Sequence, residues 1–318
     1  MPVDAELTAQ VVHEIFDAFK VCCSETAIDL YLVSASTSIQ GGQEIGQALA
    51  EVDMALSQAL VEGSYAYRRA GLTRLALPQG KIEWRAWFKE NLANKGFYLV
   101  EQPIFDAQDS CIQRELFIRV NDANGQVISA GIFMPMAQVL GLDLDVDKMV
   151  FQLLNDLLDK ESGGAPYALN LSMAFFQRAD ALEAFKLLLM SFQARSQILC
   201  VEASHQAYLK SPQMFKQIAE EVKSSGNYFG IDHLDLHISM DALQLIRPNY
   251  VKLSAQLLDD LSQSQASGAY QALHTLTSAL DIQIIAVGVD GQAVAENLKK
   301  LGIDGMQGHF LAEPEVLS

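Results

Sequence analysis

The chain has 318 residues, half of them hydrophobic, and its formal net charge is -17 at pH 7. So high a hydrophobic content supports a folded core and excludes a largely disordered chain. The negative charge argues against a nucleic-acid polymer as a partner, because binding one needs a basic surface.

The first residues, MPVDAELTAQ, lack the basic start and apolar stretch of a signal peptide. No apolar run reaches the roughly eighteen residues of a membrane span. The four cysteines show neither metal spacing nor a disulfide framework. We therefore expect a cytoplasmic chain that does not insert into a membrane.

The N-terminal part has few predicted elements. Hydrophobic periodicity predicts a helix over 10–20, a strand over 31–39 and a helix over 44–62. A linker is expected around 71–81, and the helix that follows carries Trp84 and Trp87. These elements cannot close a core alone, so residues 1–70 are interpreted as a small α/β fragment.

From Tyr98 onward, apolar runs and helical patterns alternate, which is typical of parallel strands joined by right-handed crossovers. Eight strand candidates favour a closed barrel over an open sheet. The first two are close enough to form a hairpin. The strands are expected at YLVEQPIF, ELFIRV, YALNLS, ILCVEA, YFGIDHL, NYVKLS, IQIIAVGV and GMQGHF, with the main helices at 145–159, 179–194, 212–224, 255–279 and 291–301.

Polar residues stand at or near the ends of these apolar runs: Glu115, Asn170, Glu202, Asp232 and Lys252. The carboxyl ends of parallel barrel strands meet at one face, so these side chains should converge. Oxygen-bearing side chains and a lysine in one place predict a magnesium and phosphate site.

The quoted segments resemble an EAL domain, the barrel that binds and hydrolyses bacterial cyclic di-GMP. Residues 98–314 are similar to it throughout, with Glu115 at the glutamate of the signature and Arg119 at the arginine that follows. The resemblance implies a TIM-like (β/α)8 barrel of EAL type with an antiparallel first hairpin over residues 94–318. Residues 1–70 resemble the C-terminal part of a GGDEF domain without its signature, and 71–93 are the expected linker and connecting helix.

The resemblance also implies a ligand and a metal. Cyclic di-GMP would bind at the C-terminal face of the barrel. One Mg²⁺, or Ca²⁺ or Mn²⁺ in its place, would be held by Glu115, Asn170, Glu202 and Asp232. The remaining ligand-binding residues would be Gln102, Arg119, Lys252, Gln307 and Gly308.

Three positions depart from the family pattern. His205, His233 and Val287 stand where active members have carboxylates. Valine cannot bind a metal ion or move a proton, so the resemblance predicts a degenerate phosphodiesterase without catalytic residues.

Three hypotheses about function follow. The chain is a noncatalytic cyclic di-GMP receptor of the LapD type, a nucleotide-independent interaction scaffold of the CsrD type, or a weak phosphodiesterase. A protein partner is expected in the first two cases, and a homodimer is left open. The LapD resemblance also allows the chain to be the cytoplasmic part of an inner-membrane protein.

Overall fold

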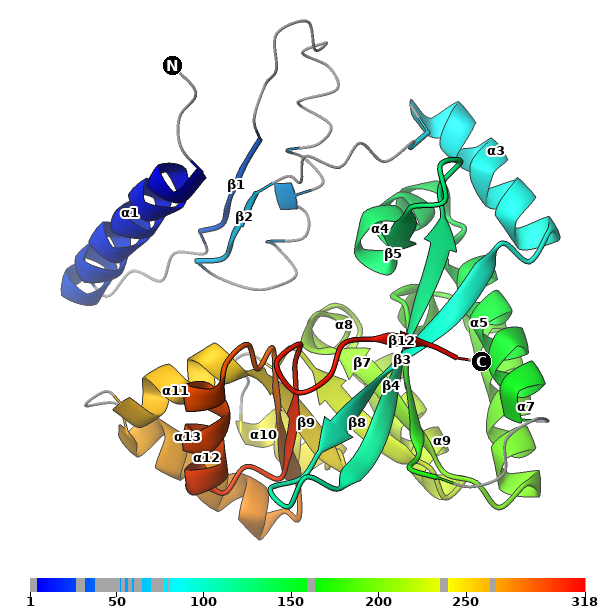
Figure 1. Cartoon of the computed structure of the whole chain (residues 1–318). Coiled ribbons are helices and arrows are strands. Elements are labelled where there is room, and N and C mark those ends of the chain that lie inside the picture. Colours follow the sequence, from blue (N-terminus) through cyan, green and yellow to red (C-terminus); the bar gives the residue numbers. More distant parts are fainter. Residues whose placement is uncertain are drawn as a thin grey trace, which may run out of the picture. The chain divides into compact units, whose positions relative to one another are not determined.

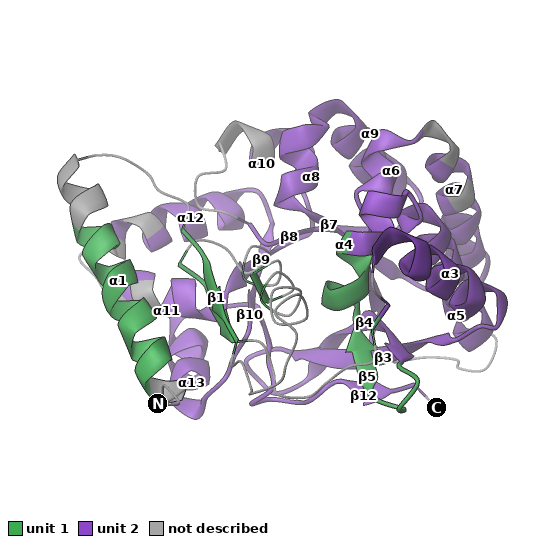
Figure 2. Cartoon of the chain, turned by 90° about the horizontal axis from the view of Figure 1, so that it is seen from above, with its two compact units in different colours: residues 1–77, 122–135 green, residues 78–121, 136–318 purple. Residues whose placement is uncertain are grey.

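The computed structural model describes residues 5–26, 32–37, 52, 55–56, 59, 65–69, 77–78, 80–158, 164–234, 240–263 and 267–317. The chain forms two compact units, coloured separately in Figure 2: residues 1–77 with 122–135, and residues 78–121 with 136–318. Most of the helix predicted over 44–62 lies outside the described residues.

The first unit contains a short parallel sheet and a long helix. Strand β1 (Ser34–Ser36) pairs with β2 (Tyr67–Arg69). Helix α1 (Ala5–Thr26) contains the predicted helix and extends beyond it at both ends. Its buried Phe16 packs edge-on against Tyr65. Strand β5 (Val127–Ser129) also belongs to this unit, and α4 (Ala130–Leu140) begins in it.

The second unit is a closed barrel of eight strands (Figure 1). β3 lies between β4 and β11 and is antiparallel to both, and all other neighbouring strands in the barrel are parallel. The predicted barrel with an antiparallel first hairpin is therefore confirmed. The strands are β3 (Phe97–Phe105), β4 (Cys111–Asn121), β6 (Tyr167–Asn170), β7 (Leu199–Ser204), β8 (Tyr228–Asp232), β9 (Tyr250–Ser254), β10 (Gln283–Val287) and β11 (Gly305–Gln307), and β12 (Glu315–Val316) pairs with β3 outside the ring.

Helices connect the parallel strands and surround the barrel (Figure 1). They are α5 (Asp143–Leu158), α6 (Ala174–Gln177), α7 (Ala179–Ala194), α8 (His205–Lys210), α9 (Pro212–Ser224), α10 (Met240–Ile246), α11 (Ala255–Gln263), α12 (Ser267–Ala279) and α13 (Gln292–Leu301), whereas α3 (Gly80–Ala93) precedes β3. The single helix predicted over 255–279 is wrong, because α11 and α12 are separate. Ser and Gly residues, which have low helix propensity, stand at this point of the sequence. None of the helices in the described part of the chain combines the length and apolarity of a membrane span.

The floor of the barrel is a small packed layer that supports the residues above it. The Tyr250 side chain is buried there among Ile104, Ala168, Cys200 and Ile285. Its ring crosses the backbone of Gly230, where an added Cβ would lie 2.3 Å from the ring. Glycine at that position is therefore what allows the tyrosine to reach across the barrel.

Candidate functional site in the barrel mouth

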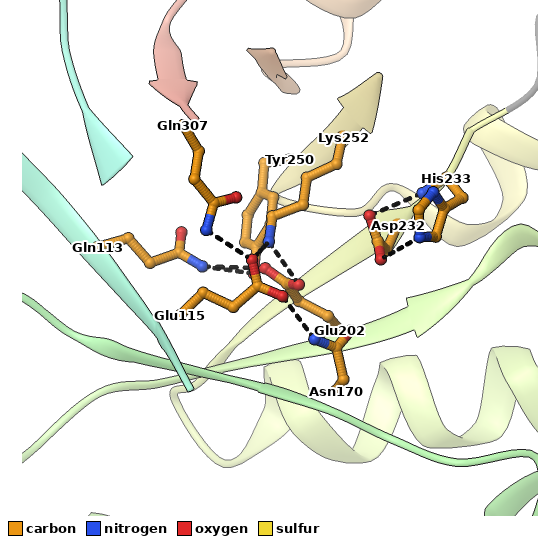
Figure 3. A network of polar contacts seen from close by, with 9 residues as sticks. All are labelled: Gln113, Glu115, Asn170, Glu202, Asp232, His233, Tyr250, Lys252 and Gln307. Carbon is orange, nitrogen blue, oxygen red and sulfur yellow. Dashed lines mark hydrogen bonds and ion pairs between the residues drawn. The ribbon is translucent and has the colours of Figure 1, made fainter. Parts of the chain in front are cut away.

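A hydrogen-bonded network of seven residues lies inside the barrel, as Figure 3 shows. We call it the carboxylate cluster. It consists of Gln113 and Glu115 on β4, Asn170 on β6, Glu202 on β7, Tyr250 and Lys252 on β9, and Gln307 on β11. Five of the nine residues predicted from the sequence to bind ligand or metal are thus brought together.

Lys252 is the centre of this cluster. Its Nζ lies 2.6 Å from Glu115 Oε2 and 2.6 Å from Glu202 Oε2. The lysine side chain is 1% exposed. Burial alone would lower the pKa of Lys252, but the two carboxylates outweigh it and raise that pKa above its usual value. The lysine is therefore charged and neutralises one carboxylate.

Glu202 is fully buried, and its protonation reflects this. Burial raises the pKa of Glu202 to about 8, against the opposing attraction of Lys252. Tyr250 Oη donates to Glu202 Oε1 at 2.8 Å, and Gln113 Nε2 donates to the same oxygen at 3.1 Å. The same amide also donates to Tyr250 Oη at 2.9 Å. Glu202 thus sits in a site built to hold one carboxyl group.

Glu115 has two amide donors besides the lysine. Asn170 Nδ2 donates to its Oε1 at 2.6 Å, and Gln307 Nε2 donates to its Oε2 at 2.9 Å. Strand register explains the first contact, since Glu115 is level with Ala168 and Asn170 extends the neighbouring strand by two residues. Both amides come from the carboxyl ends of their strands, which the apolar runs predicted for Asn170.

Sequence reasoning missed Gln113 and Tyr250. Each lies two residues before a predicted site residue on the same strand, Glu115 and Lys252 respectively. Side chains two apart in a strand point to the same face. This period of two was a usable signal for both residues.

Asp232 lies outside the carboxylate cluster, at what we call the rim, with His233, Ser254 and Val287. Its Oδ1 accepts the backbone N–H of His233 at 2.8 Å, and its Oδ2 lies 3.3 Å from His233 Nε2. His233 has a left-handed backbone, with φ of 50°. Val287 is level with Ser254 on one side and Gln307 on the other, and it packs on the apolar floor. His205, the third departure, is buried at the start of α8.

The other predicted ligand-binding residues also lie outside the cluster. Gln102 Nε2 donates to the carbonyl oxygen of Ala312 at 2.9 Å, which ties the closing segment to β3. Gly308 approaches the backbone of Val289 so closely that an added Cβ would lie 2.1 Å from its carbonyl oxygen. Both contacts shape the loop after β11.

Arg119 lies four residues beyond Glu115 on β4, and the alternation of the strand places it on the same face. Its Nη1 donates to the carbonyl oxygen of Ile118 at 3.0 Å, and its guanidinium lies 5.3 Å from the Phe117 ring centroid. Burial lowers the pKa of Arg119. Within the described part of the chain this arginine has no carboxylate partner.

The carboxylates of the cluster and rim are hard oxygen donors of the kind that Mg²⁺ prefers. Their arrangement, however, does not fit an ion, because each carboxylate oxygen of Glu115, Glu202 and Asp232 already has a protein partner. Among the described residues, no three His, Cys, Asp or Glu side chains are grouped as metal ligands. The magnesium site remains a prediction from the resemblance.

An EAL domain model matches residues 85–314, so the chain belongs to the EAL domain family. The bifunctional diguanylate cyclase/cyclic di-GMP phosphodiesterase MucR of Pseudomonas aeruginosa is 22% identical over 98% of this chain and 47% of MucR. The RNase E specificity factor CsrD of Escherichia coli is 21% identical over 87% of this chain and 43% of CsrD.

Among solved structures, the S helix-GGDEF-EAL part of Vibrio cholerae LapD, bound to cyclic di-GMP, is similar with a TM-score of 0.76 and 21% identity. The match covers 96% of this chain and 74% of that one. The predicted likeness to the LapD and CsrD types is thus confirmed at the level of fold and family. The chain spans less than half the length of the curated relatives that it matches.

Proposed function

We propose that this chain is a receptor that binds cyclic di-GMP at the carboxyl ends of its barrel strands and does not hydrolyse it. Membership of the EAL family supports the ligand, as does the likeness in fold to a LapD structure bound to cyclic di-GMP. The magnesium ion is not part of this proposal, since the oxygens that would hold it are in use.

Arg119 is the observation that carries the proposal. A cation that is partly removed from water loses hydration, and its lowered pKa reflects that cost. The guanidinium has five donors in a planar fork, which matches the two oxygens of a phosphate. With no carboxylate partner in the described residues, the donors that Ile118 does not use are available to an anionic ligand in the barrel mouth.

The absence of hydrolysis is proposed from the rim and its surroundings. In-line attack on a phosphodiester needs groups that bind metal ions and activate water. Val287 has neither ability, and its side chain is packed against the apolar floor. His233 is engaged with Asp232. The site would therefore bind an anion through Arg119 without a base at the rim to activate water.

Calorimetric titration of cyclic di-GMP into the whole chain tests the binding, first in Mg²⁺ and then in EDTA. We expect micromolar or tighter binding, with the nucleotide recovered intact by chromatography. Linear dinucleotide among the products would favour the weak phosphodiesterase instead. No binding in either buffer would contradict the receptor.

Arg119→Ala tests the residue on which the proposal rests. We expect loss of one bidentate charged contact to weaken binding by at least about tenfold. Arg114→Ala is the matched control, because Arg114 is on the same strand but the opposite face, where it pairs with Glu101 at 3.3 Å. Equal affinities for the Arg119 variant and the unaltered chain would remove the main support for the receptor.

The second candidate is a nucleotide-independent scaffold that acts on a protein partner, like the relative CsrD. A specific observation favours it: the carboxylate cluster is satisfied internally, so its residues have a structural reason to be present without any ligand. A chain that fails to bind cyclic di-GMP would be assigned to this class.

We also propose the domain organisation, location and partners that were expected from the sequence. Residues 1–70 would be the end of a degenerate GGDEF domain, 71–93 the linker and connecting helix, and 94–318 the EAL domain. The chain would act in the cytoplasm, alone or as part of an inner-membrane protein, with a protein partner and as a monomer or homodimer. Light scattering with and without nucleotide would determine the last point.

A further inference from the structure

We propose that the chain's own donors replace the metal ion at this site, so that the barrel mouth holds its two glutamates, and binds its nucleotide, without a divalent cation. The nucleotide half of this inference rests on the proposed function. The metal half concerns only the residues of the chain and can be tested without any ligand.

Lys252 occupies the space between the two glutamates. A divalent ion bound between Glu115 and Glu202 would need an oxygen from each, and the lysine ammonium already lies 2.6 Å from one oxygen of each. Two like charges cannot share that space in a low-dielectric interior without a large repulsion. An incoming ion must therefore displace a lysine that is 1% exposed and paired with both glutamates.

The other carboxylate oxygen of Glu202, Oε1, is also occupied. Gln113 and Tyr250 both donate to Oε1, from below the mouth. A metal ion at this oxygen would leave a buried amide and a buried hydroxyl without their acceptor. Such an unpaired buried group costs about 1–3 kcal/mol. These two residues thus act as positioning residues, holding Glu202 in the orientation in which it meets the lysine.

Asp232, which an ion would need as a further ligand, is occupied as well. His233 occupies both of its oxygens, one through the backbone N–H and the other through the imidazole. The left-handed backbone of His233 sets the direction of its side chain, whose imidazole meets the preceding carboxylate. The oxygens of all three acidic side chains are therefore occupied by protein donors.

The test measures Mn²⁺ binding to the whole chain by the loss of the free-ion electron paramagnetic resonance signal, with no nucleotide present. The unaltered chain should bind no Mn²⁺ at submillimolar concentration. The double variant Lys252→Met, His233→Ala removes the ammonium from both glutamates and the imidazole from Asp232. It should bind Mn²⁺ at least about tenfold more tightly, because the ion no longer meets the charge of the ammonium.

One Mn²⁺ bound per unaltered chain would overturn the inference. No gain in the double variant, shown to be folded by circular dichroism, would equally overturn the roles given to Lys252 and His233. If the double variant does not fold, cyclic di-GMP titration of the unaltered chain decides: equal affinity in Mg²⁺ and in EDTA supports the inference, and loss in EDTA overturns it. Failure to bind the nucleotide in both buffers would refute the proposed function, and the Mn²⁺ result would then judge the metal half alone.

Discussion

The carboxylate cluster and the rim belong to the same barrel mouth, yet they differ in how far their residues match the family. Glu115, Glu202 and Lys252 are almost fully buried, and by the resemblance they match the residue types of the family. His233 has a side chain that is 45% exposed, and by the same resemblance it departs from the pattern. Breaking a buried ion pair is costly, whereas an exposed position can change at little cost. Retention of the cluster is therefore explained by stability alone, and evidence for a ligand must come from Arg119.

Lys252→Met should have the largest effect on this comparison. It leaves Glu115 and Glu202 buried without their cation, and we expect the free energy of unfolding to fall by about 3–5 kcal/mol. Urea denaturation at neutral pH measures it.

The matched control is Lys299→Met. Lys299 Nζ also lies 2.6 Å from a carboxylate oxygen, that of Asp109, but this pair is at the surface. Its loss should cost less than about 1 kcal/mol. Similar losses in the two variants would show that burial does not distinguish the cluster.

Asp147 sharpens the comparison, because it is a buried carboxyl without a lysine. It lies on α5 and accepts a hydrogen bond from Ser172 Oγ. Burial raises the pKa of Asp147 to about 8, with Ser172 opposing the shift and Asp143 adding to it. The unfolded value is near 4. Between these values the folded state binds more protons, so stability should fall as the pH rises from about 4 to about 8 and then level off.

Asp147→Asn keeps an acceptor for Ser172 and removes the titration. Urea denaturation between about pH 5 and about pH 8 should show a shallower decline for this variant than for the unaltered chain. Some decline should remain, because burial raises the pKa of Glu202 as well. Parallel curves for the two proteins would mean that Asp147 does not titrate in this range.

Tyr250→Phe removes one donor to Glu202 and keeps the ring in the floor. Above the raised pKa of Glu202, about 8, this carboxyl is ionised. Hydrogen bonds to charged groups contribute about 1.5–3 kcal/mol, so a loss within that range is expected in urea denaturation at such a pH. Tyr270→Phe is the matched control, since Tyr270 Oη donates to the neutral carbonyl of Leu301 at 2.7 Å. That change should cost about 0.5–1.5 kcal/mol. A smaller loss for the Tyr250 variant would refute a positioning role for its hydroxyl.

Much of the barrel and of its carboxylate cluster could be predicted from the sequence, but not all of the contacts. Apolar runs that alternate with helical patterns predicted the barrel, and parallel strand ends predicted that Glu115, Asn170 and Lys252 would meet. The capture of Asp232 could not be predicted, because it depends on the left-handed backbone of His233. The hydrogen bonds to Glu202 Oε1 could not be predicted either, because they depend on how far the side chains of Gln113 and Tyr250 reach across the barrel.

His233→Ala should have the smallest effect. Alanine keeps the backbone N–H that donates to Asp232 Oδ1, and both residues carry a Cβ, so the strain of the left-handed backbone is unchanged. Only the imidazole contact at 3.3 Å is lost, from a largely exposed side chain. We expect the free energy of unfolding in urea to change by no more than about 0.5 kcal/mol. A loss as large as that of Lys252→Met would show that the rim is as necessary to the fold as the cluster, and retention of buried charge would no longer explain which residues of the mouth have changed.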